Sequence, residues 1–463
     1  MSGKSLKRIS LVIMLIMMVC ALVFVSACSN NGGTANEGAA GDSGAAADDA
    51  GAADDTGGED DADAADAGAA SDGESIKIGW VLPLTGPVAE HTVTIDFVME
   101  KALDIINNEK GGIYIEEYGK KVPIEIIKVD SESDATVASE AAEKLVLSNK
   151  VDLLCSSWTP MDTVPVSAVA ERNNIPALME NSPSGPWLES GPYTWSFGNL
   201  FEIEYLVDDI ISGWETIETN KIVGFVYDNS VDGVSFSALM QEKAEAAGYT
   251  VIDPGRFPVG TNDYTSMISE FKSKDCDIIT GDMAAPDFAV MWRQFHQQGL
   301  VPKVMSLTKA GTMKAGMEAV GDNLAAGVNS AGFYHREFPY TNSLTGQTST
   351  EMVDEWQSVE PNGDPTTLGY DWQMFEVIYD VFTRAGSIDR ETVRDAIAAT
   401  NLETSFGTVE YADDHVYRAP VFLNQWFVDD AGNLDYTIIA AVGYPEIPIL
   451  SPLQPVPGSD GAE

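Results

Sequence analysis

Residues 76–91 read IKIGWVLPLTGPVAEH, and this stretch decides the fold. Four of its first seven residues are apolar and share one pleat face of a predicted strand: Ile76, Ile78, Trp80 and Leu82. Gly79 and Val81 point to the opposite face. A Thr-Gly-Pro turn at residues 85–87 leads into an amphipathic run over residues 93–107. A strand, a turn and a helix in this order predict an α/β unit, whose ligands lie beyond the carboxyl ends of the strands.

The leader, residues 1–27, has the layout of a secretory signal. A basic start that includes Arg8 precedes an apolar run over residues 9–24, and Cys28 directly follows small residues. The ending Val-Ser-Ala-Cys resembles the bacterial lipobox, which implies cleavage before Cys28 and a lipid on its sulfur. The apolar run is nearly as long as the about 20 residues that span a bilayer. An uncleaved N-terminal anchor is therefore the alternative.

Residues 28–75 predict an acidic tether between the lipid and the folded part of the chain. After Cys28 the stretch is dominated by Gly, Ala, Asp and Ser, and it contains no aromatic residue, lysine or arginine. Such a composition buries too little apolar area to offset the entropy of ordering, so we expect disorder. Binding of calcium or of a partner by the acidic residues is the alternative to a simple spacer.

The strong negative charge limits the classes of function. The formal net charge is −46, and the part after the tether is still near −36. Nucleic-acid binding needs basic residues that neutralise phosphates, so this class is excluded. The charge suits a soluble extracytoplasmic protein or a salty habitat. After the tether only Cys155 and Cys276 remain, too far apart for a metal motif or a disulfide framework, and we expect two buried thiols.

Strands and helices alternate through most of the chain. One series covers residues 76–214, and a second begins with IVGFVY at residues 222–227. This alternation predicts parallel sheets with helices on both faces, and the length of the chain predicts two lobes rather than one core. The fold class is therefore α/β, with two doubly wound lobes and a cleft between them. The tail predicts helices and antiparallel strands, with a hairpin turn at residues 429–433.

Several motifs occur in one register over residues 76–433: IKIGWVLPLTGP, NNEKGGI, VDLLCSSWTP, IPALMENSPS, IVGFVYD and FGTVEYADDHVYRAPVFLNQWF. In their order and spacing the chain resembles the Leu/Ile/Val-type solute-binding proteins that feed bacterial ABC importers. The resemblance implies the periplasmic binding protein type I fold, with two Rossmann-like lobes joined by a three-crossover hinge. The first lobe would span residues 76–199 and 332–402. The second would span residues 200–331 and 403–463.

The same resemblance implies which residues at the strand ends hold the ligand. The expected contacts are His91, Ser156, Ser157, Trp158, Ser182, Ser184, Asp228, Asp282, Met283, Thr308 and Lys309. Hydroxyls and backbone N–H groups at helix N-termini accept anions without a buried counter-charge, so we expect a ligand carboxylate at the serines. Trp158 directly follows two of these serines and is expected over the ligand; packing in the hinge or core is its alternative. His91 otherwise caps the next helix, and Lys309 is otherwise a solvated loop residue.

Amino-acid binders that this chain resembles usually carry an acidic residue on the loop after the strand at residues 304–307. Here that loop reads Thr308-Lys309. Either Asp282 or Asp228 holds the ligand ammonium, or the ligand has no ammonium.

The sequence thus predicts an extracytoplasmic, lipid-anchored and monomeric receptor that binds a small polar ligand (an amino acid, an amide or a carboxylate) and docks on ABC permease subunits. No enzymatic activity, cofactor, metal or nucleic acid is expected. A sensory protein that docks on a membrane receptor is one alternative. A serine hydrolase using Ser156 or Ser157 with His91 is another, although no G-x-S-x-G motif is present. A DNA-binding regulator would need a helix-turn-helix where the tether lies.

Overall fold

The first sheet is built around β1 (Ile76–Leu82). In the computed structural model, which describes residues 74–459, β1 lies between β4 and β5 and pairs parallel with both. The sheet has the order β15-β7-β6-β5-β1-β4, and every neighbouring pair is parallel. Its other strands are β4 (Ile124–Asp130), β5 (Leu153–Ser157), β6 (Ala177–Pro183), β7 (Ser196–Phe201) and β15 (Val416–Arg418). The predicted leader, Cys28 and nearly all of the tether lie outside the described residues.

The alternation of β1 places its side chains in two separate cores. Ile76, Ile78, Trp80 and Leu82 are fully buried in the core that α2 and α13 help to form. Val81 belongs to the other core, with residues of α3 and α4. A Cβ on Gly79 would lie 3.0 Å from Leu145 Cδ1, so only glycine fits there without movement. The predicted pleat of β1 is confirmed.

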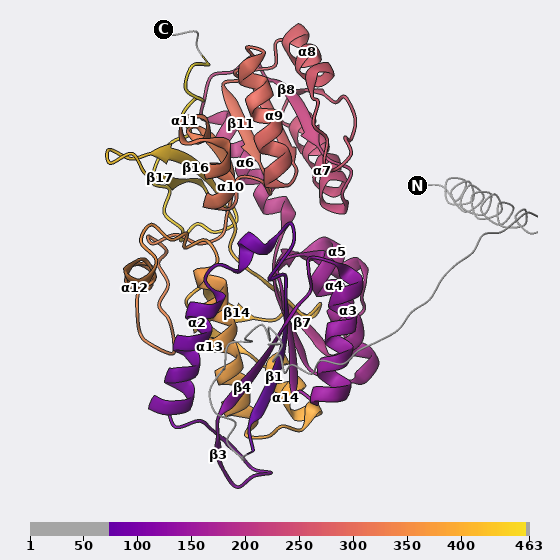
Figure 1. Ribbon diagram of the computed structural model, residues 1–463, viewed down its shortest axis with the longest axis vertical. Helices are drawn as coiled ribbons and strands as arrows, with labels where there is room; N and C mark the ends of the chain where they lie inside the picture. The colour runs from indigo at the N-terminus through magenta and orange to yellow at the C-terminus, as the bar shows by residue number, and fades with distance from the viewer. Residues whose placement is uncertain (1–73, 460–463) are drawn as a thin grey trace, which may run out of the picture. The chain divides into compact units, whose positions relative to one another are not determined.

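Helices cover both faces of the first sheet (Figure 1). The helices α3, α4 and α5 lie on one face, and α2, α13 and α14 lie on the other. The helical segments of this part are η1 (Ala89–Thr92), α2 (Ile95–Leu103), η2 (Asp104–Glu109), α3 (Ala135–Lys144), η3 (Leu145–Asn149), α4 (Pro160–Asn173), α5 (Ser184–Glu189), α13 (Leu368–Ala385) and α14 (Arg390–Ala398). The single helix predicted over residues 93–107 is thus an α-helix that continues as a π-helical turn.

The second sheet has the order β17-β16-β12-β11-β10-β8-β9. Its pairs from β9 to β12 are parallel, whereas β16 and β17 are antiparallel additions at one edge. The strands are β8 (Ile222–Tyr227), β9 (Thr250–Ile252), β10 (Ile278–Asp282), β11 (Val304–Leu307), β12 (Val328–Gly332), β16 (Phe422–Val428) and β17 (Leu434–Ala440). The predicted hairpin turn is confirmed, because Asp429 Oδ1 accepts hydrogen bonds from the Ala431 and Asn433 backbone N–H groups between β16 and β17.

The remaining elements complete the second lobe and the connections. Helices α6 to α11 belong to the second series, α12 lies in the return connection, and two small antiparallel pairs flank the first sheet. Their bounds are α6 (Ile203–Glu215), α7 (Val231–Ala246), α8 (Thr265–Lys274), α9 (Ala285–Gln297), α10 (Lys314–Val320), α11 (Asp322–Ala325), α12 (Ser349–Val359), β2 (Ile113–Ile115), β3 (Lys120–Val122), β13 (Asn401–Thr404) and β14 (Gly407–Glu410).

The chain passes between the two sheets after β7, after β12 and after β15. These passages give the three crossovers that we expected. One expected boundary differs: residues 403–418 lie with the first sheet, because β15 pairs with β7. Gln373 of α13 fixes this segment by donating hydrogen bonds to Thr404 Oγ1 and to the Phe406 carbonyl. The last crossover therefore begins after Arg418.

The prediction of two buried thiols is confirmed, because Cys155 and Cys276 are both free and buried.

Candidate functional site

A cavity of about 60 Å³ lies where the ends of strands from both sheets meet. The first sheet and its loops contribute His91, Trp158 and Asn181, and the second contributes Asp282 and Lys309. The remaining lining residues are Val88, Thr159, Pro160, Pro183, Phe201, Leu206, Asp232, Phe236, Thr308, Thr312, Ala331 and Phe333. Most of this surface is apolar, with a few polar groups placed at defined points, as is usual in small-molecule sites.

Two lining residues have strained backbone conformations. Trp158 follows β5 with a φ of 86°, and Asn181 lies near the end of β6 with a φ of 42°. Positive φ values are uncommon outside glycine, and they gather where function requires them. Because Ser157 and Glu180 are register partners in the sheet, the residues that follow them, Trp158 and Asn181, lie at neighbouring strand ends.

The polar atoms of these two side chains have no hydrogen-bond partner within residues 74–459. They are the indole Nε1 of Trp158, and Nδ2 and Oδ1 of Asn181. Trp158 is 5% exposed and Asn181 is 1% exposed, so bulk water does not replace the missing partners. Buried polar groups in folded proteins nearly always find partners, and an exception calls for an explanation such as a ligand.

His91 and Trp158 begin an aromatic wall. Their ring centroids are 5.1 Å apart, and the Trp158 ring also contacts Phe333 edge-on at 6.4 Å. Phe333 directly follows β12 and lies 5.1 Å from Phe201, the last residue of β7. The wall therefore reaches from loops of the first sheet to the points where two of the crossovers begin.

His91 is neutral at physiological pH. Its Nδ1 lies 3.1 Å from the Val88 carbonyl oxygen, which can only accept, so Nδ1 carries the proton and Nε2 keeps a free lone pair. Burial is the main cause that lowers the pKa of His91 to about 4; the Val88 hydrogen bond opposes this shift, and the nearby Lys309 charge adds to it. His91 thus offers the site a hydrogen-bond acceptor.

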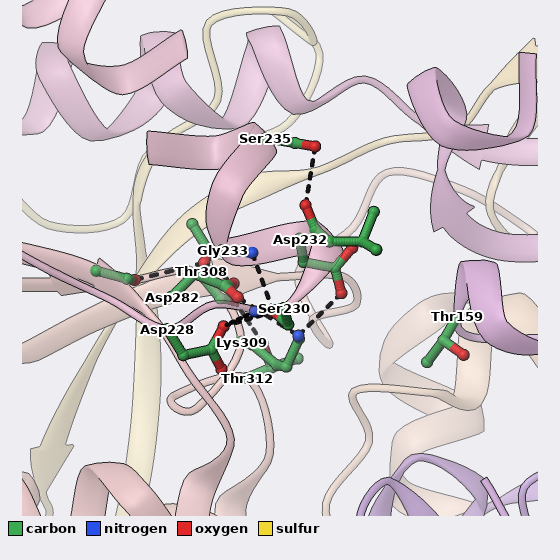
Figure 2. Close-up of polar contacts among 12 residues, drawn as sticks. Thr159, Asp228, Ser230, Asp232, Gly233, Ser235, Asp282, Thr308, Lys309 and Thr312 are labelled. Carbon is green, nitrogen blue, oxygen red and sulfur yellow. Dashed lines mark hydrogen bonds and ion pairs between the residues drawn. The ribbon is translucent and has the colours of Figure 1, made fainter. Parts of the chain in front are cut away.

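The second lobe places a three-member ion cluster at the cavity: Lys309, Asp232 and Asp282 (Figure 2). The Lys309 Nζ lies 2.9 Å from Asp232 Oδ2 and 3.4 Å from Asp282 Oδ1. Burial alone would lower the pKa of Lys309, but the two carboxylates outweigh it and raise that pKa. Burial raises the pKa of Asp282, and Lys309 opposes this rise. The Thr308 hydroxyl also donates to Asp282 Oδ2.

The cavity thus brings together five of the expected residues: His91, Trp158, Asp282, Thr308 and Lys309. The other six do not line it. Ser156 and Ser157 lie in β5 and Ser182 lies in β6, so the sheet holds these three serines, whereas Ser184 belongs to α5. Ser157 accepts from Trp80 Nε1 at 2.9 Å and donates to Glu180 Oε1 at 2.6 Å. Ser156 is buried within β5.

Four further expected residues have structural partners of their own. Ser182 lies 3.3 Å from the Thr163 hydroxyl, and Ser184 donates to Glu202 Oε2 at 2.7 Å. Asp228 accepts from the Ser230 backbone N–H at 2.9 Å, beside the start of α7. Met283 is fully buried in the core. These four side chains therefore bond to or pack against other protein groups rather than facing the cavity.

Sequence reasoning did not find several residues of the cavity. Asn181 lies in β6, in the stretch where we expected Ser182 and Ser184 to bind because hydroxyls are common anion ligands. Asp232 and Phe236 lie in the first and second turns of α7 rather than on a strand end. Phe201 is the last residue of β7 and Phe333 directly follows β12, and no periodic pattern marks these side chains as cavity residues.

No group of three or more His, Cys, Asp or Glu side chains in residues 74–459 is arranged to hold a metal ion. Over the same residues, no helix has the length and apolar character needed to cross a membrane.

The sequence profile of the periplasmic binding protein family matches residues 75–433. The chain belongs to this family. Among curated relatives, the Leu/Ile/Val-binding protein homolog 3 of Brucella melitensis is 23% identical over 363 residues, which cover 75% of this chain and 90% of the relative. The protein is thus a periplasmic binding protein.

Solved structures agree on the fold. LivJ of Streptococcus pneumoniae, a branched-chain amino acid binding protein in complex with isoleucine, superposes with a TM-score of 0.67 at 17% identity and covers 79% of this chain and all of that one. A solute-binding protein of Rhodopseudomonas palustris in complex with 3,4-dihydroxybenzoic acid gives a TM-score of 0.61 at 17% identity, covering 83% and 99% of the two chains. This periplasmic binding protein thus has the predicted type I fold.

Proposed function

We propose that this chain captures a small organic solute in the cavity between its two sheets and delivers it to the permease of an ABC importer. The observation that carries this proposal is the set of unpaired polar atoms of Trp158 and Asn181 at the cavity. Burying a donor or an acceptor without a partner costs free energy, and a ligand in the cavity would remove that cost. The two lobes would close around the solute by a hinge motion at the crossovers.

The lining favours a solute with an apolar body and one polar head. Phe201, Phe236 and Phe333 provide apolar surface, whereas the polar atoms lie at the Trp158–Asn181 edge and at the ion cluster. Amino acids with apolar side chains, amides and small carboxylic acids all combine an apolar body with a polar head. The isoleucine and 3,4-dihydroxybenzoic acid held by the two solved structures fall in the same range of size and polarity.

The contacts of the candidate nucleophile speak against a hydrolase. The Ser157 hydroxyl is bonded to Trp80 and Glu180, and His91 directs Nδ1 at the Val88 carbonyl. A serine nucleophile has to reach its substrate, whereas Ser156 and Ser157 are fully buried in β5 and do not line the cavity. We therefore propose binding without chemistry.

A thermal-shift screen of the purified full chain against amino acids, amides and organic acids tests the binding function. A ligand that binds only the native protein raises its melting temperature, by an amount that grows with concentration. We expect at least one class to do so, and we expect Leu147→Ala, an exposed change far from the cavity lining, to leave that shift intact. The proposal fails if no solute of any class raises the melting temperature.

We further propose that the mature protein is a monomer held by lipid on Cys28 at the outer side of a bacterial membrane, with residues 29–75 as its spacer. The anchor is supported by the leader and by the small residues before Cys28. Cys28→Ala should move the protein from the membrane fraction to the soluble extracytoplasmic fraction. Unchanged membrane association of this variant would favour an uncleaved anchor.

A further inference from the structure

The inference concerns the chemical class of the ligand, and it rests on the proposed binding function. The unpaired atoms at the first-sheet side of the cavity are two donors, Trp158 Nε1–H and the Asn181 amide N–H₂, and one acceptor, the Asn181 carbonyl oxygen. Exchange of the two Asn181 amide atoms by a flip leaves this inventory unchanged. The two residues lie side by side because they follow the register partners Ser157 and Glu180.

Each class of head group satisfies a different part of this inventory. A carboxylate accepts from the donors but leaves the Asn181 carbonyl oxygen unpaired. An ammonium group donates to that oxygen but leaves the Trp158 and Asn181 donors unpaired. An amino acid would pair all of these atoms with its two charged groups, but it would bring a carboxylate into the buried space. A carboxamide carries both a carbonyl oxygen and N–H donors, so it can pair with the Asn181 amide in a two-bond ring and accept from Trp158 as well.

The charges on the opposite side of the cavity also favour an uncharged head group such as a carboxamide. Lys309 is the single cation among the lining residues, and its Nζ already contacts Asp232 at 2.9 Å and Asp282 at 3.4 Å. The lining therefore presents one positive and two acidic side chains, while His91 offers an acceptor and no charge. A ligand carboxylate would enter this buried space without a free counter-charge, which is unfavourable.

We propose that the cavity selects solutes with an uncharged amide head, a carboxamide or a urea-like group on a small apolar or aromatic body, and that Asn181 and Trp158 read this head. The Asn181 side chain determines the specificity, because its amide offers an unpaired donor and an unpaired acceptor together. The apolar lining residues, Phe333 among them, receive the body of the solute.

Matched compounds test the head group while keeping the body constant. Isovaleramide, isovalerate and isoamylamine share one body, and benzamide, benzoate and benzylamine share another. Titration calorimetry and thermal shift on the full chain should show that one or both amides bind, at least about tenfold more tightly than the acid or the amine of the same body.

Asn181→Asp keeps the size of the side chain and the residue's tolerance of a positive φ, but it removes the N–H₂ donor and adds a charge. We expect this variant to lose amide binding by about tenfold or more. Its unliganded melting temperature should fall, because a carboxylate is buried there without a partner, and thermal unfolding without ligand measures that effect separately from binding. Asn362→Asp is the matched control, because Asn362 also has a positive φ, of 63°, but is exposed and does not line the cavity. It should leave amide binding unchanged.

The amide class is overturned if the acid or the amine binds more tightly than the amide, if none of the six compounds binds, or if Asn181→Asp binds amides as well as the parent does. These outcomes differ from failure of the binding function itself. That function fails only when the broad screen of amino acids, amides and organic acids yields no ligand at all.

Discussion

The Trp158 indole and the His91 imidazole lie with their ring centroids 5.1 Å apart, tilted by 55°, although they come from loops after different strands of the first sheet. His91 belongs to η1, which follows β1, and Trp158 directly follows β5. The parallel pairing of β1 with β5 brings the two loops together. The pair forms one wall of the cavity, so a change in either ring is expected to affect ligand binding directly.

Trp158 provides the first prediction. Trp158→Ala removes the ring and the N–H and should abolish the largest ligand-induced thermal shift found in the screen. Trp158→Phe keeps an aromatic ring but removes the donor, and it should weaken binding by about tenfold. Calorimetric titration of both variants measures the effect. Wild-type affinity in Trp158→Ala would remove this residue from the binding site.

Lys309 is predicted to stabilise the folded protein as well as to line the cavity. Lys309→Met leaves the Asp282 carboxylate, which is 1% exposed, without its counter-charge. We expect the free energy of unfolding to fall by about 3 kcal/mol at pH 8. Because burial raises the pKa of Asp282, its protonation at pH 5 should reduce that loss. Urea unfolding at the two pH values measures it.

A double variant separates charge from packing at this cluster. Lys309→Met combined with Asp282→Asn removes the buried carboxylate together with its partner, so most of the lost stability should return. An equal loss in the single and double variants would show that the ammonium is not what stabilises Asp282.

The buried carboxylate of Asp209 predicts how stability depends on pH. Burial raises its pKa to about 8, the Val442 backbone N–H that donates to it opposes this, and Asp208 adds to the rise. Between the unfolded value near 3.8 and about 8, the folded protein binds more protons, so stability falls as the pH rises. Asp209→Asn should be more stable than the parent at pH 8, by about 2 kcal/mol. Denaturant titrations at pH 5 and 8 check this, and equal pH slopes in the two proteins would contradict it.

Glu90 predicts that ligand affinity depends on pH. Its carboxylate faces the second lobe, since a Cβ on Gly316 of α10 would lie 3.7 Å from Glu90 Oε2. Burial and, next, Asp364 raise the pKa of Glu90 to about 7. If opening of the lobes exposes Glu90, its pKa returns to the ordinary value of 4.5. Closure then takes up a proton at pH values between 4.5 and about 7. The dissociation constant should then fall about tenfold from pH 8 to pH 6.

Substitution of Glu90 checks the cause of that pH dependence. Glu90→Gln cannot titrate, so its affinity should change little between pH 8 and pH 6. Glu100→Gln, an exposed change on α2, should keep the dependence of the parent. A parent affinity that does not change with pH would refute the link between Glu90 and closure.

The sequence predicted the fold well because hydrophobic periodicity reports it directly. The alternation of Ile76, Ile78 and Trp80 placed one face of β1 in the correct core, and the run of strands and helices implied both sheets. The tail was harder to assign. Whether residues 403–418 join the first or the second sheet depends on tertiary contacts such as those of Gln373, which no local pattern reveals.

The site was predicted only in part, for a reason that lies in strand length. Five of the eleven expected residues line the cavity, but β5 extends to Ser157 and β6 extends to Pro183. Moving a strand end by two residues exchanges which side chains reach the cavity, so Asn181 replaced the expected serines. Side chains from α7 and the crossovers, such as Asp232 and Phe333, enter through tertiary packing and leave no sequence signal.

A crystal structure of the protein grown with the tightest ligand from the screen tests the central claim most directly. We predict ligand density between the two sheets, with the polar head within hydrogen-bond distance of Trp158 Nε1 and the Asn181 amide and the body against Phe333. Density for that ligand elsewhere on the molecule, with the cavity at Trp158 and Asn181 still vacant, would contradict the account.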